Sequence, residues 1–319
     1  MEEEIDYMNT GWEELGDIGS GINRIAQMLY KESITGYEQF RTGGVNVTCS
    51  FHTPNKRSIL KISPKWFRYS LSKENWCLNR LKNESNARVP EALYYEGDEN
   101  DYFPGHEILV VEYLDGRIPN SSDLSDPSFH EDLGEFYVNM HKLVVKRYGW
   151  LVPANDNDAI VNDFIGTCDE WKQFLIDIDN IGVSLSSELV SSNEYRWLIK
   201  QLQCRGGECL PALLHGDFRM DNVIIGQNGL FVIDFQNCFS GDSLYDIGIG
   251  VQVYPQLIPF IGSYSELELT DNDIAKILLY AMRYSFSVLG YAATRKEFNL
   301  AKTYKNRFNE LREMYENYS

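Results

Sequence analysis

Three oxygen-bearing side chains lie close together in one short stretch of the sequence. Asp217 and Asn222 are five residues apart, and Asp234 ends the apolar run 230–233. Two short strands joined by a turn would bring Asn222 and Asp234 together, with Asp217 facing them from a loop. An amide oxygen and a carboxylate suit Mg²⁺ bound to phosphates, and a further carboxylate can accept a hydroxyl proton. The group therefore predicts phosphoryl transfer.

The spacing within this group is its specific feature. Asp217 and Asn222 are separated as in the kinase catalytic loop, where the Asp takes the substrate proton and the Asn holds a metal. His215 and Gly216 come directly before Asp217, and a strand pattern, a turn and a Val-Ile-Asp-Phe segment follow. The alternative, in which these groups only cap a hairpin, would leave acids and an amide converging without a purpose.

A nucleotide kinase also needs a cation on the α- and β-phosphates and an acid that holds this cation in place. Lys61 lies in the apolar run 59–62, so in a strand it points to the opposite side from its neighbours. Glu74 follows thirteen residues later in a helical pattern. We expect these two residues to form the pair. The alternative for Lys61 is a solvent-facing surface lysine, because Lys56 and Lys65 are close in sequence.

The elements that would position these residues divide the chain in two. The first part combines strand patterns with helical ones at 21–32 and 72–81, and strand signals stop after position 115. We expect an α+β protein with an N-terminal lobe at 1–115, an antiparallel sheet with one main helix. A larger, mostly helical lobe follows at 116–319, with strands only within 213–234. The strand patterns of the first lobe lie at 37–40, 42–51, 58–62, 89–95 and 107–114.

The composition limits the classes of function. The 319 residues include 29 Lys and Arg against 47 Asp and Glu, which gives a net charge of −18. Such a chain repels nucleic-acid phosphates and anionic lipid headgroups, so we expect neither nucleic acid nor a membrane as partner, and cationic ligands are favoured. No apolar stretch reaches the roughly 20 residues of a membrane span. The first residues lack the pattern of a secretion signal, so we expect a cytoplasmic protein.

These motifs resemble those of the aminoglycoside phosphotransferase and choline kinase-like superfamily. Its members have a His-Gly-Asp segment, a following Asn and an Asp that ends a strand, as at 215–217, Asn222 and Asp234 here. A later segment looks like the family's Gly-Asp-Pro-x-x-Asp-Leu motif, with Ser243 where proline is common. The resemblance implies a bilobal, protein-kinase-like fold that uses ATP or GTP. In it Asp217 is the catalytic base, and Asn222 and Asp234 bind Mg²⁺.

The same resemblance assigns a phosphate-covering turn. Gly43, Gly44 and Asn46 lie between two predicted strands, where glycines let backbone N–H groups approach an anion. The segment is not a GxGxxG, but many family members have Gly-Gly followed by Ser-Asn at this place. Val45 takes the position of that serine here.

Residues at the end of the last strand of the first lobe would form the hinge between the lobes. In the resemblance, backbone groups of Glu112, Tyr113 and Leu114 hydrogen-bond adenine. A plain strand end describes these three residues equally well. The resemblance also gives Asp246 a structural role in orienting the catalytic loop, and His141 a role in packing against it.

The acceptor is expected in the C-terminal lobe, whose acids would attract a cation; the alternative is that they only keep an acidic chain in solution. We favour a small cationic acceptor, an aminoglycoside-type antibiotic, whose phosphorylation would give antibiotic resistance. A metabolic kinase for choline, ethanolamine, an amino alcohol or a sugar is the alternative, and a nucleotide-binding pseudokinase is the alternative of another class. A protein kinase is disfavoured because Gln236 replaces the Gly of Asp-Phe-Gly. The acids are Asp156, Asp158, Asp163, Asp169, Glu170, Asp177, Asp179, Asp271 and Asp273.

Overall fold

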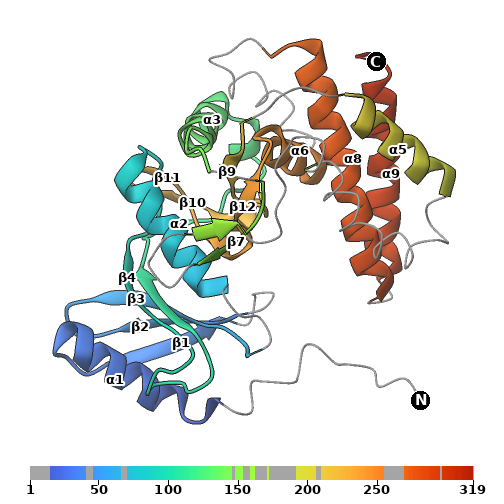
Figure 1. The fold of residues 1–319 in the computed structure, drawn as a ribbon. Coiled ribbons are helices and arrows are strands. Elements are labelled where there is room, and N and C mark those ends of the chain that lie inside the picture. Colours follow the sequence, from blue (N-terminus) through green and yellow to red (C-terminus); the bar gives the residue numbers. More distant parts are fainter. Residues whose placement is uncertain are drawn as a thin grey trace, which may run out of the picture.

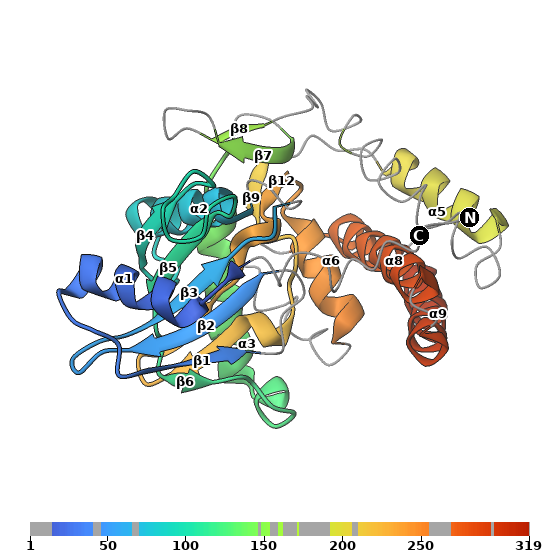
Figure 2. The same cartoon turned by 90° about the horizontal axis from the view of Figure 1, so that it is seen from below.

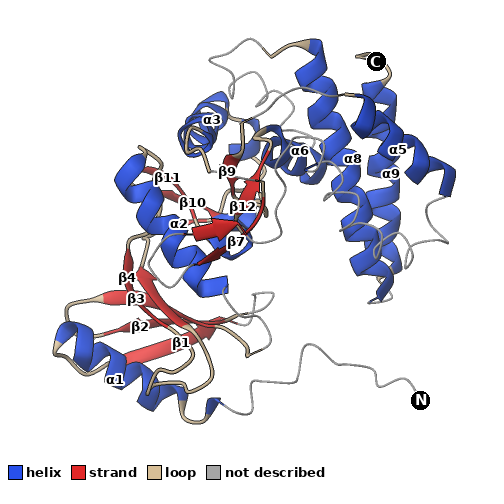
Figure 3. Cartoon of the chain, viewed as in Figure 1, coloured by secondary structure: helices blue, strands red, loops and turns tan. Residues whose placement is uncertain are grey.

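The computed structural model describes residues 15–40, 46–65, 70–145, 148–153, 159–161, 171, 192–205, 210–254, 269–294 and 297–318. A sheet with a helix along it forms one side of the molecule, and most of the helices lie on the other side (Figure 1). Strands and helices are both abundant, with strands in that sheet and in the centre (Figure 3). The predicted α+β class is confirmed.

The N-terminal sheet has five antiparallel strands in the order β1-β2-β3-β5-β4. They are β1 (Gly36–Phe40), β2 (Val47–His52), β3 (Arg57–Ile62), β4 (Ala92–Glu96) and β5 (Ile108–Glu112). One face packs against α1 (Ile18–Tyr30), as Figures 1 and 2 show. Leu60 and Ile62 are buried on that face, so strand alternation turns Lys61 to the other face.

Local chemistry sets the ends of α1. The Asp17 side chain caps its first turn by accepting a hydrogen bond from the Ser20 N–H at 3.3 Å, and Lys31 ends it in a left-handed conformation with φ 59°. The sequence predicts a helix at 21–32. The helix begins earlier, at Ile18, because the Asp17 cap precedes the apolar spacing.

The helix α2 (Ser70–Glu84) lies against the other face of the sheet and carries Glu74. Its apolar residues Leu71, Cys77, Leu78 and Leu81 belong to the main core of the molecule. It packs on β4, on β5 and on the short 3₁₀ helix η4 (Phe235–Asn237). α2 thereby connects the sheet to the segment that follows Asp234.

Two smaller sheets lie in the centre, with strand orders β11-β10-β6 and β8-β7-β12-β9. The sequence predicts strands here only within 213–234, because segments of two to five residues carry little periodicity. The boundary expected after position 115 stays a prediction. The strands are β6 (Gly116–Arg117), β7 (Gly149–Pro153), β8 (Ala159–Val161), β9 (Ala212–Leu214), β10 (Val223–Gly226), β11 (Gly229–Val232) and β12 (Phe239–Gly241).

Helices make up most of the remaining described chain. α8 packs against both α6 and α9, and Figure 2 shows α8 and α9 side by side. None of the described helices is long and apolar enough to cross a membrane. These elements are η2 (Asp123–Ser125), α3 (Pro127–His141), α5 (Ser192–Cys204), η3 (Met220–Asn222), α6 (Leu244–Val253), α8 (Asp271–Thr294) and α9 (Phe298–Tyr315).

Candidate active site

Lys61 is the centre of a buried ion-paired group. Its Nζ lies 2.7 Å from Glu74 Oε1 and 2.8 Å from Asp234 Oδ1. Lys61 is 8% exposed and Glu74 is 1% exposed, so Lys61 lies in the interior and not in solvent. The strand β3, the helix α2 and the segment after β11 each contribute one member. The fold therefore brings together three residues that the sequence analysis selected separately.

The three charges of this group influence one another's protonation. Burial alone would raise the pKa of Asp234, but the Lys61 ammonium lowers it below its usual value. Burial would lower the pKa of Lys61, but Asp234 and Glu74 raise it. Burial raises the pKa of Glu74. Asp234 is therefore the carboxylate of the group that best keeps its negative charge.

Asp246, in α6, holds the loop that carries Asp217. Its carboxylate accepts hydrogen bonds from the backbone N–H groups of His215 at 2.8 Å and Gly216 at 3.0 Å, and lies 3.1 Å from His141 Nε2. Gly216 has a φ of +78°, and a Cβ there would lie 2.4 Å from a backbone oxygen. The loop therefore needs glycine at this position, and the geometry of Asp246 is that of an anchor.

Asp217 and Asn222 are joined within this loop. The side-chain NH₂ group of Asn222 donates to the backbone carbonyl oxygen of Asp217 at 2.9 Å. The backbone carbonyl oxygen of Asn222 accepts from the Ile233 N–H, also at 2.9 Å. Burial raises the pKa of the Asp217 carboxyl, although the nearby His215 and Arg219 oppose this. A carboxylate with a raised pKa is a better proton acceptor than an ordinary one.

The oxygen atoms of Asn222 and Asp234 fit a magnesium ion. Because the amide nitrogen of Asn222 is bonded to the loop backbone, its Oδ1 is the atom left for a cation. Oδ1 of Asp234 is bonded to Lys61, and Oδ2 accepts, among the described residues, only a 3.5 Å hydrogen bond from Gln236. Amide and carboxylate oxygens are donors that Mg²⁺ prefers, with waters and phosphates completing its coordination.

The turn that the sequence predicts to cover the phosphates is described only at its last residue, Asn46. Gly43 and Gly44 lie outside the described residues, and Asn46 directly precedes β2. The Asn46 amide donates to Gln236 Oε1 at 2.6 Å, which brings the end of the turn next to Asp234. The sequence singles out Gln236 only as a departure from Asp-Phe-Gly, because no local pattern reports a contact 190 positions away.

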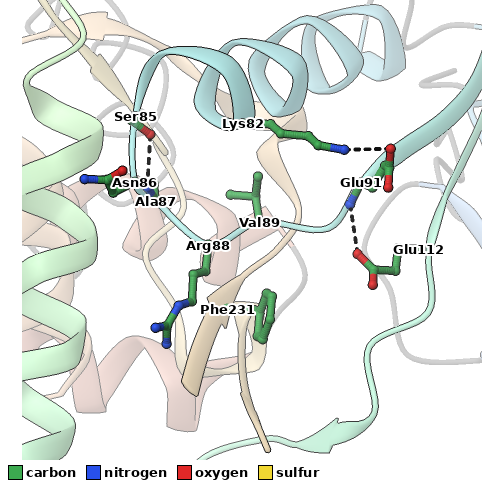
Figure 4. Close-up of a pocket in the computed structure, with 9 residues that line it drawn as sticks. All are labelled: Lys82, Ser85, Asn86, Ala87, Arg88, Val89, Glu91, Glu112 and Phe231. Carbon is green, nitrogen blue, oxygen red and sulfur yellow. Dashed lines mark hydrogen bonds and ion pairs between the residues drawn. The ribbon is translucent and has the colours of Figure 1, made fainter. Parts of the chain in front are cut away.

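The expected hinge follows β5. The Glu112 N–H donates to the Glu91 carbonyl oxygen at 2.9 Å, so a contact of Glu112 with adenine would have to use its own carbonyl group. The Glu112 side chain accepts from the Glu91 N–H at 3.3 Å and lines a pocket of about 340 Å³ where α2 leads into β4 (Figure 4). The Tyr113 ring packs on the Arg57 guanidinium at 3.6 Å. Leu114 is half-buried.

The surroundings of Asp217 contain three tyrosines that the sequence analysis missed. Tyr254 follows α6, Tyr284 belongs to α8 and Tyr304 belongs to α9. The Tyr254 hydroxyl accepts from the Met220 N–H at 3.2 Å. Burial raises the pKa of Tyr284, and the negative charge of Asp217 raises it further. A chain with 20 tyrosines gives no signal for which of them surround Asp217.

Nine acids are expected to attract a cationic acceptor, and the two that the structure describes do not lie beside Asp217. Asp273 lies in the first turn of α8, where its side chain accepts from the Thr270 N–H at 3.0 Å and so caps the helix. Tyr284 lies eleven residues further along α8, which is about 17 Å. Arg219 pairs with Asp221 at 2.7 Å. The seven acids from Asp156 to Asp179 lie outside the described residues.

The family is identified by comparison with known proteins. A family model described as the phosphotransferase enzyme family matches residues 36–276, which is most of the chain. The chain therefore belongs to this family, and it is a phosphotransferase. A comparison with curated protein sequences found no match.

Solved structures share the protein-kinase-like fold at low sequence identity. A putative fructosamine-3-kinase from Haemophilus somnus 129PT has a TM-score of 0.66 at 19% identity, over 91% of this chain and 96% of its own. A thermostable mutant of aminoglycoside phosphotransferase APH(4)-Ia with ADP and hygromycin B has a TM-score of 0.65 at 15% identity, over 91% and 97%. The GDP and kanamycin complex of APH(2")-IIia has a TM-score of 0.62 at 15% identity, over 91% and 98%.

Proposed function

We propose that this phosphotransferase is a magnesium-dependent small-molecule kinase that uses ATP or GTP. The main observation behind this proposal is that Lys61, Glu74 and Asp234 form one ion-paired group. A loop that is anchored on Asp246 places Asp217 beside this group. Loss of the proposed base or of a proposed metal ligand would have favoured a pseudokinase, and Asp217, Asn222 and Asp234 are all present.

Each residue has a separate task in this proposal. Asp217 accepts the proton of the acceptor hydroxyl as the hydroxyl oxygen bonds to the γ-phosphorus and the bond from phosphorus to the oxygen of the departing diphosphate breaks. Lys61, held by Glu74, contacts the α- and β-phosphates. Asn222 and Asp234 would hold Mg²⁺, which would supply positive charge to neutralise the phosphates.

The nucleotide would be held from the N-terminal lobe. Backbone groups of the turn with Gly43, Gly44 and Asn46 cover the phosphates, and the hinge residues Glu112, Tyr113 and Leu114 contact adenine or guanine. The proposed reaction takes place in the cytoplasm, where nucleoside triphosphates are supplied.

The favoured acceptor is a cationic aminoglycoside-type antibiotic, so that the enzyme would give resistance. The net charge of −18 supports a cation, and two of the similar structures carry hygromycin B or kanamycin. Because Arg219 lies near Asp217, the cationic groups of such an acceptor would have to lie away from the reacting hydroxyl.

A metabolic kinase for a sugar is the second candidate, with choline, ethanolamine and other amino alcohols as further acceptors of this kind. The observation that favours it is the set of phenol groups and the Arg219 guanidinium around Asp217, which can hydrogen-bond several hydroxyls. Tyrosine rings also pack well on the apolar face of a sugar ring.

The test is nucleotide turnover with Mg²⁺ in a coupled assay, with ATP and with GTP. The acceptor panel comprises hygromycin B, kanamycin, a macrolide, choline, ethanolamine, a glycated amine and several sugars. Stimulation by an aminoglycoside supports the first candidate, and stimulation by a sugar or an amino alcohol supports the second. Lack of Mg²⁺-nucleotide binding, measured separately by calorimetry, would refute both.

A further inference from the structure

Cys77 and Cys238 are two buried free thiols that the proposed mechanism does not use. Cys77 lies in α2, three residues after Glu74, and Cys238 directly follows η4, four residues after Asp234. Both side chains are fully buried, and α2 packs on η4. The two segments that carry the acidic partners of Lys61 therefore meet at a pair of thiols.

The two thiols are in contact. Cys238 Sγ donates a hydrogen bond to the backbone carbonyl oxygen of Lys73 at 4.0 Å. Cys77 lies one helical turn after Lys73, and side chains in a helix point back over the preceding turn, so the Cys77 thiol lies over the same carbonyl. A hydrogen bond from the Cys77 thiol lowers the pKa of Cys238, although burial opposes this, and burial raises the pKa of Cys77 well above its usual value. Cys238 is therefore the thiol that ionises more readily.

This asymmetry suits oxidation of the pair by a peroxide, which is a small oxidant. The Cys238 thiolate attacks one oxygen of hydrogen peroxide and the O–O bond breaks, which gives a sulfenic acid on Cys238 and a hydroxide that takes up the proton lost from the thiol. The Cys77 sulfur then bonds to Cys238 Sγ, and the sulfenic hydroxyl leaves with the Cys77 proton as water. Two thiols are oxidised to a disulfide, and one peroxide is reduced to two waters.

We propose that Cys77 and Cys238 form an oxidation site for peroxide, and that their disulfide reversibly switches off the phosphotransferase. The effect on activity rests on the proposed function, whereas formation of the disulfide does not. A covalent bond draws α2 and η4 together, so Glu74 and Asp234 move with the backbones that carry them. A displacement of about 1 Å in a positioning group can lower turnover about 10²-fold. Disulfides of cytoplasmic proteins are usually transient and regulatory, as this proposal requires.

The experiment treats the full chain with hydrogen peroxide, blocks the remaining thiols and maps the linked peptides by mass spectrometry. Acceptor-stimulated turnover and MgADP affinity are measured before oxidation, after it and after reduction with dithiothreitol. The variants are Cys77→Ser and Cys238→Ser, because Ser is close to Cys in size and forms no disulfide. Cys204→Ser is the matched control, since Cys204 is exposed at the end of α5. Thermal unfolding checks that each variant is folded.

The oxidised wild type and oxidised Cys204→Ser are expected to contain peptides linked through Cys77 and Cys238. Both should lose turnover by about 10²-fold, bind MgADP more weakly and recover on reduction. Cys238→Ser should keep its turnover in peroxide, because the reacting thiol is absent. Cys77→Ser should instead hold Cys238 as a sulfenic acid, which dimedone labels, because the thiol that forms the disulfide is absent.

Two results would overturn the inference while the reduced chain still binds MgADP. Absence of the linked peptides after peroxide treatment would remove the oxidation site, and linked peptides with unchanged turnover and unchanged MgADP binding would remove the switch. Absence of MgADP binding by the reduced wild type would overturn the proposed function, and peptide mapping would still test the disulfide. The failure of the inference and the failure of the proposed function are therefore distinguishable.

Discussion

Asp234 and Asp217 are two carboxylates of one site with opposite surroundings. Asp234 is bonded to Lys61 at 2.8 Å, and the ammonium overcomes the effect of burial and lowers its pKa. Asp217 makes no salt bridge with any described residue, and burial raises its pKa. Environments that shift the pKa values of two carboxyl groups in opposite directions indicate that the two groups have different roles. One is suited to remain an anion that holds a cation, and the other to take up and release a proton.

The most severe test of this comparison is the removal of the carboxylate of Asp217, the proposed base. Asp217→Asn is expected to lower kcat by about 10²- to 10⁴-fold, because the acceptor hydroxyl loses its proton acceptor, while MgADP affinity stays nearly unchanged. Stimulated nucleotide turnover and calorimetry measure the two quantities. Asp221→Asn, an exposed neighbour in the same loop, is the control and should keep most of the turnover. Near-normal kcat in Asp217→Asn would show that the base is elsewhere.

Replacing each carboxylate by an amide should change the free energy of unfolding in opposite directions. The folded pKa of Asp234 is lowered, so its contribution to stability is present above its usual pKa of 3.8 and lost as the pH falls through the folded value. The folded pKa of Asp217 is raised, so its contribution is present below 3.8 and lost as the pH rises through the folded value. At neutral pH we therefore expect Asp234→Asn to destabilise the fold, and Asp217→Asn to stabilise it.

The expected loss for Asp234→Asn is about 1.5–3 kcal/mol, since a hydrogen bond to a charged group is removed. The expected gain for Asp217→Asn is about 0.5–2 kcal/mol, as for other relieved active-site residues. Chemical denaturation at neutral pH measures both free energies of unfolding. Asp234→Asn should also weaken MgADP binding, which Asp217→Asn should not. Shifts of the same sign in the two variants would contradict the comparison.

The pH dependence of turnover should show the same separation in the wild type. As the pH falls, Asp217 is protonated first because its pKa is raised, and kcat/KM declines while Asp234 is still charged. MgADP affinity should therefore persist into acid beyond the point at which turnover is lost. Titrations and rates measured at the same values between about pH 4 and pH 8 test this order. Loss of MgADP affinity before turnover would reverse the assignment.

The sequence predicts the parts of this site that follow a local pattern. Lys61 alternates with apolar residues in a strand, and Asp217 and Asn222 have the spacing that a short loop requires. Each pattern is a direct consequence of strand or loop geometry, so the five-stranded sheet and the loop were within reach of sequence reasoning.

Other parts depend on contacts that leave no local pattern. Gln236 acquires its position from Asn46, and Tyr284 acquires its position from the packing of α8 on α6. Strands such as β6 and β12 have two or three residues and form only because neighbouring strands complete their hydrogen bonds. Such features are set by tertiary structure, which one sequence does not display.

The smallest expected effect concerns the anchor behind Asp217. His141 Nε2 lies 3.1 Å from Asp246, but the carboxylate also accepts from two backbone N–H groups of the loop that carries Asp217. His141→Ala should therefore leave the loop in place and cost about 0.5–1.5 kcal/mol of stability, with kcat reduced less than about tenfold. His130→Ala is a matched control: His130 is buried in the same helix, α3, and bonds to the Leu124 carbonyl oxygen at 2.9 Å. His130→Ala should lose a similar amount of stability and leave kcat unchanged. A loss of turnover in His141→Ala as large as that in Asp217→Asn would show that His141 takes part in the chemistry and that Asp217 is not the single proton acceptor.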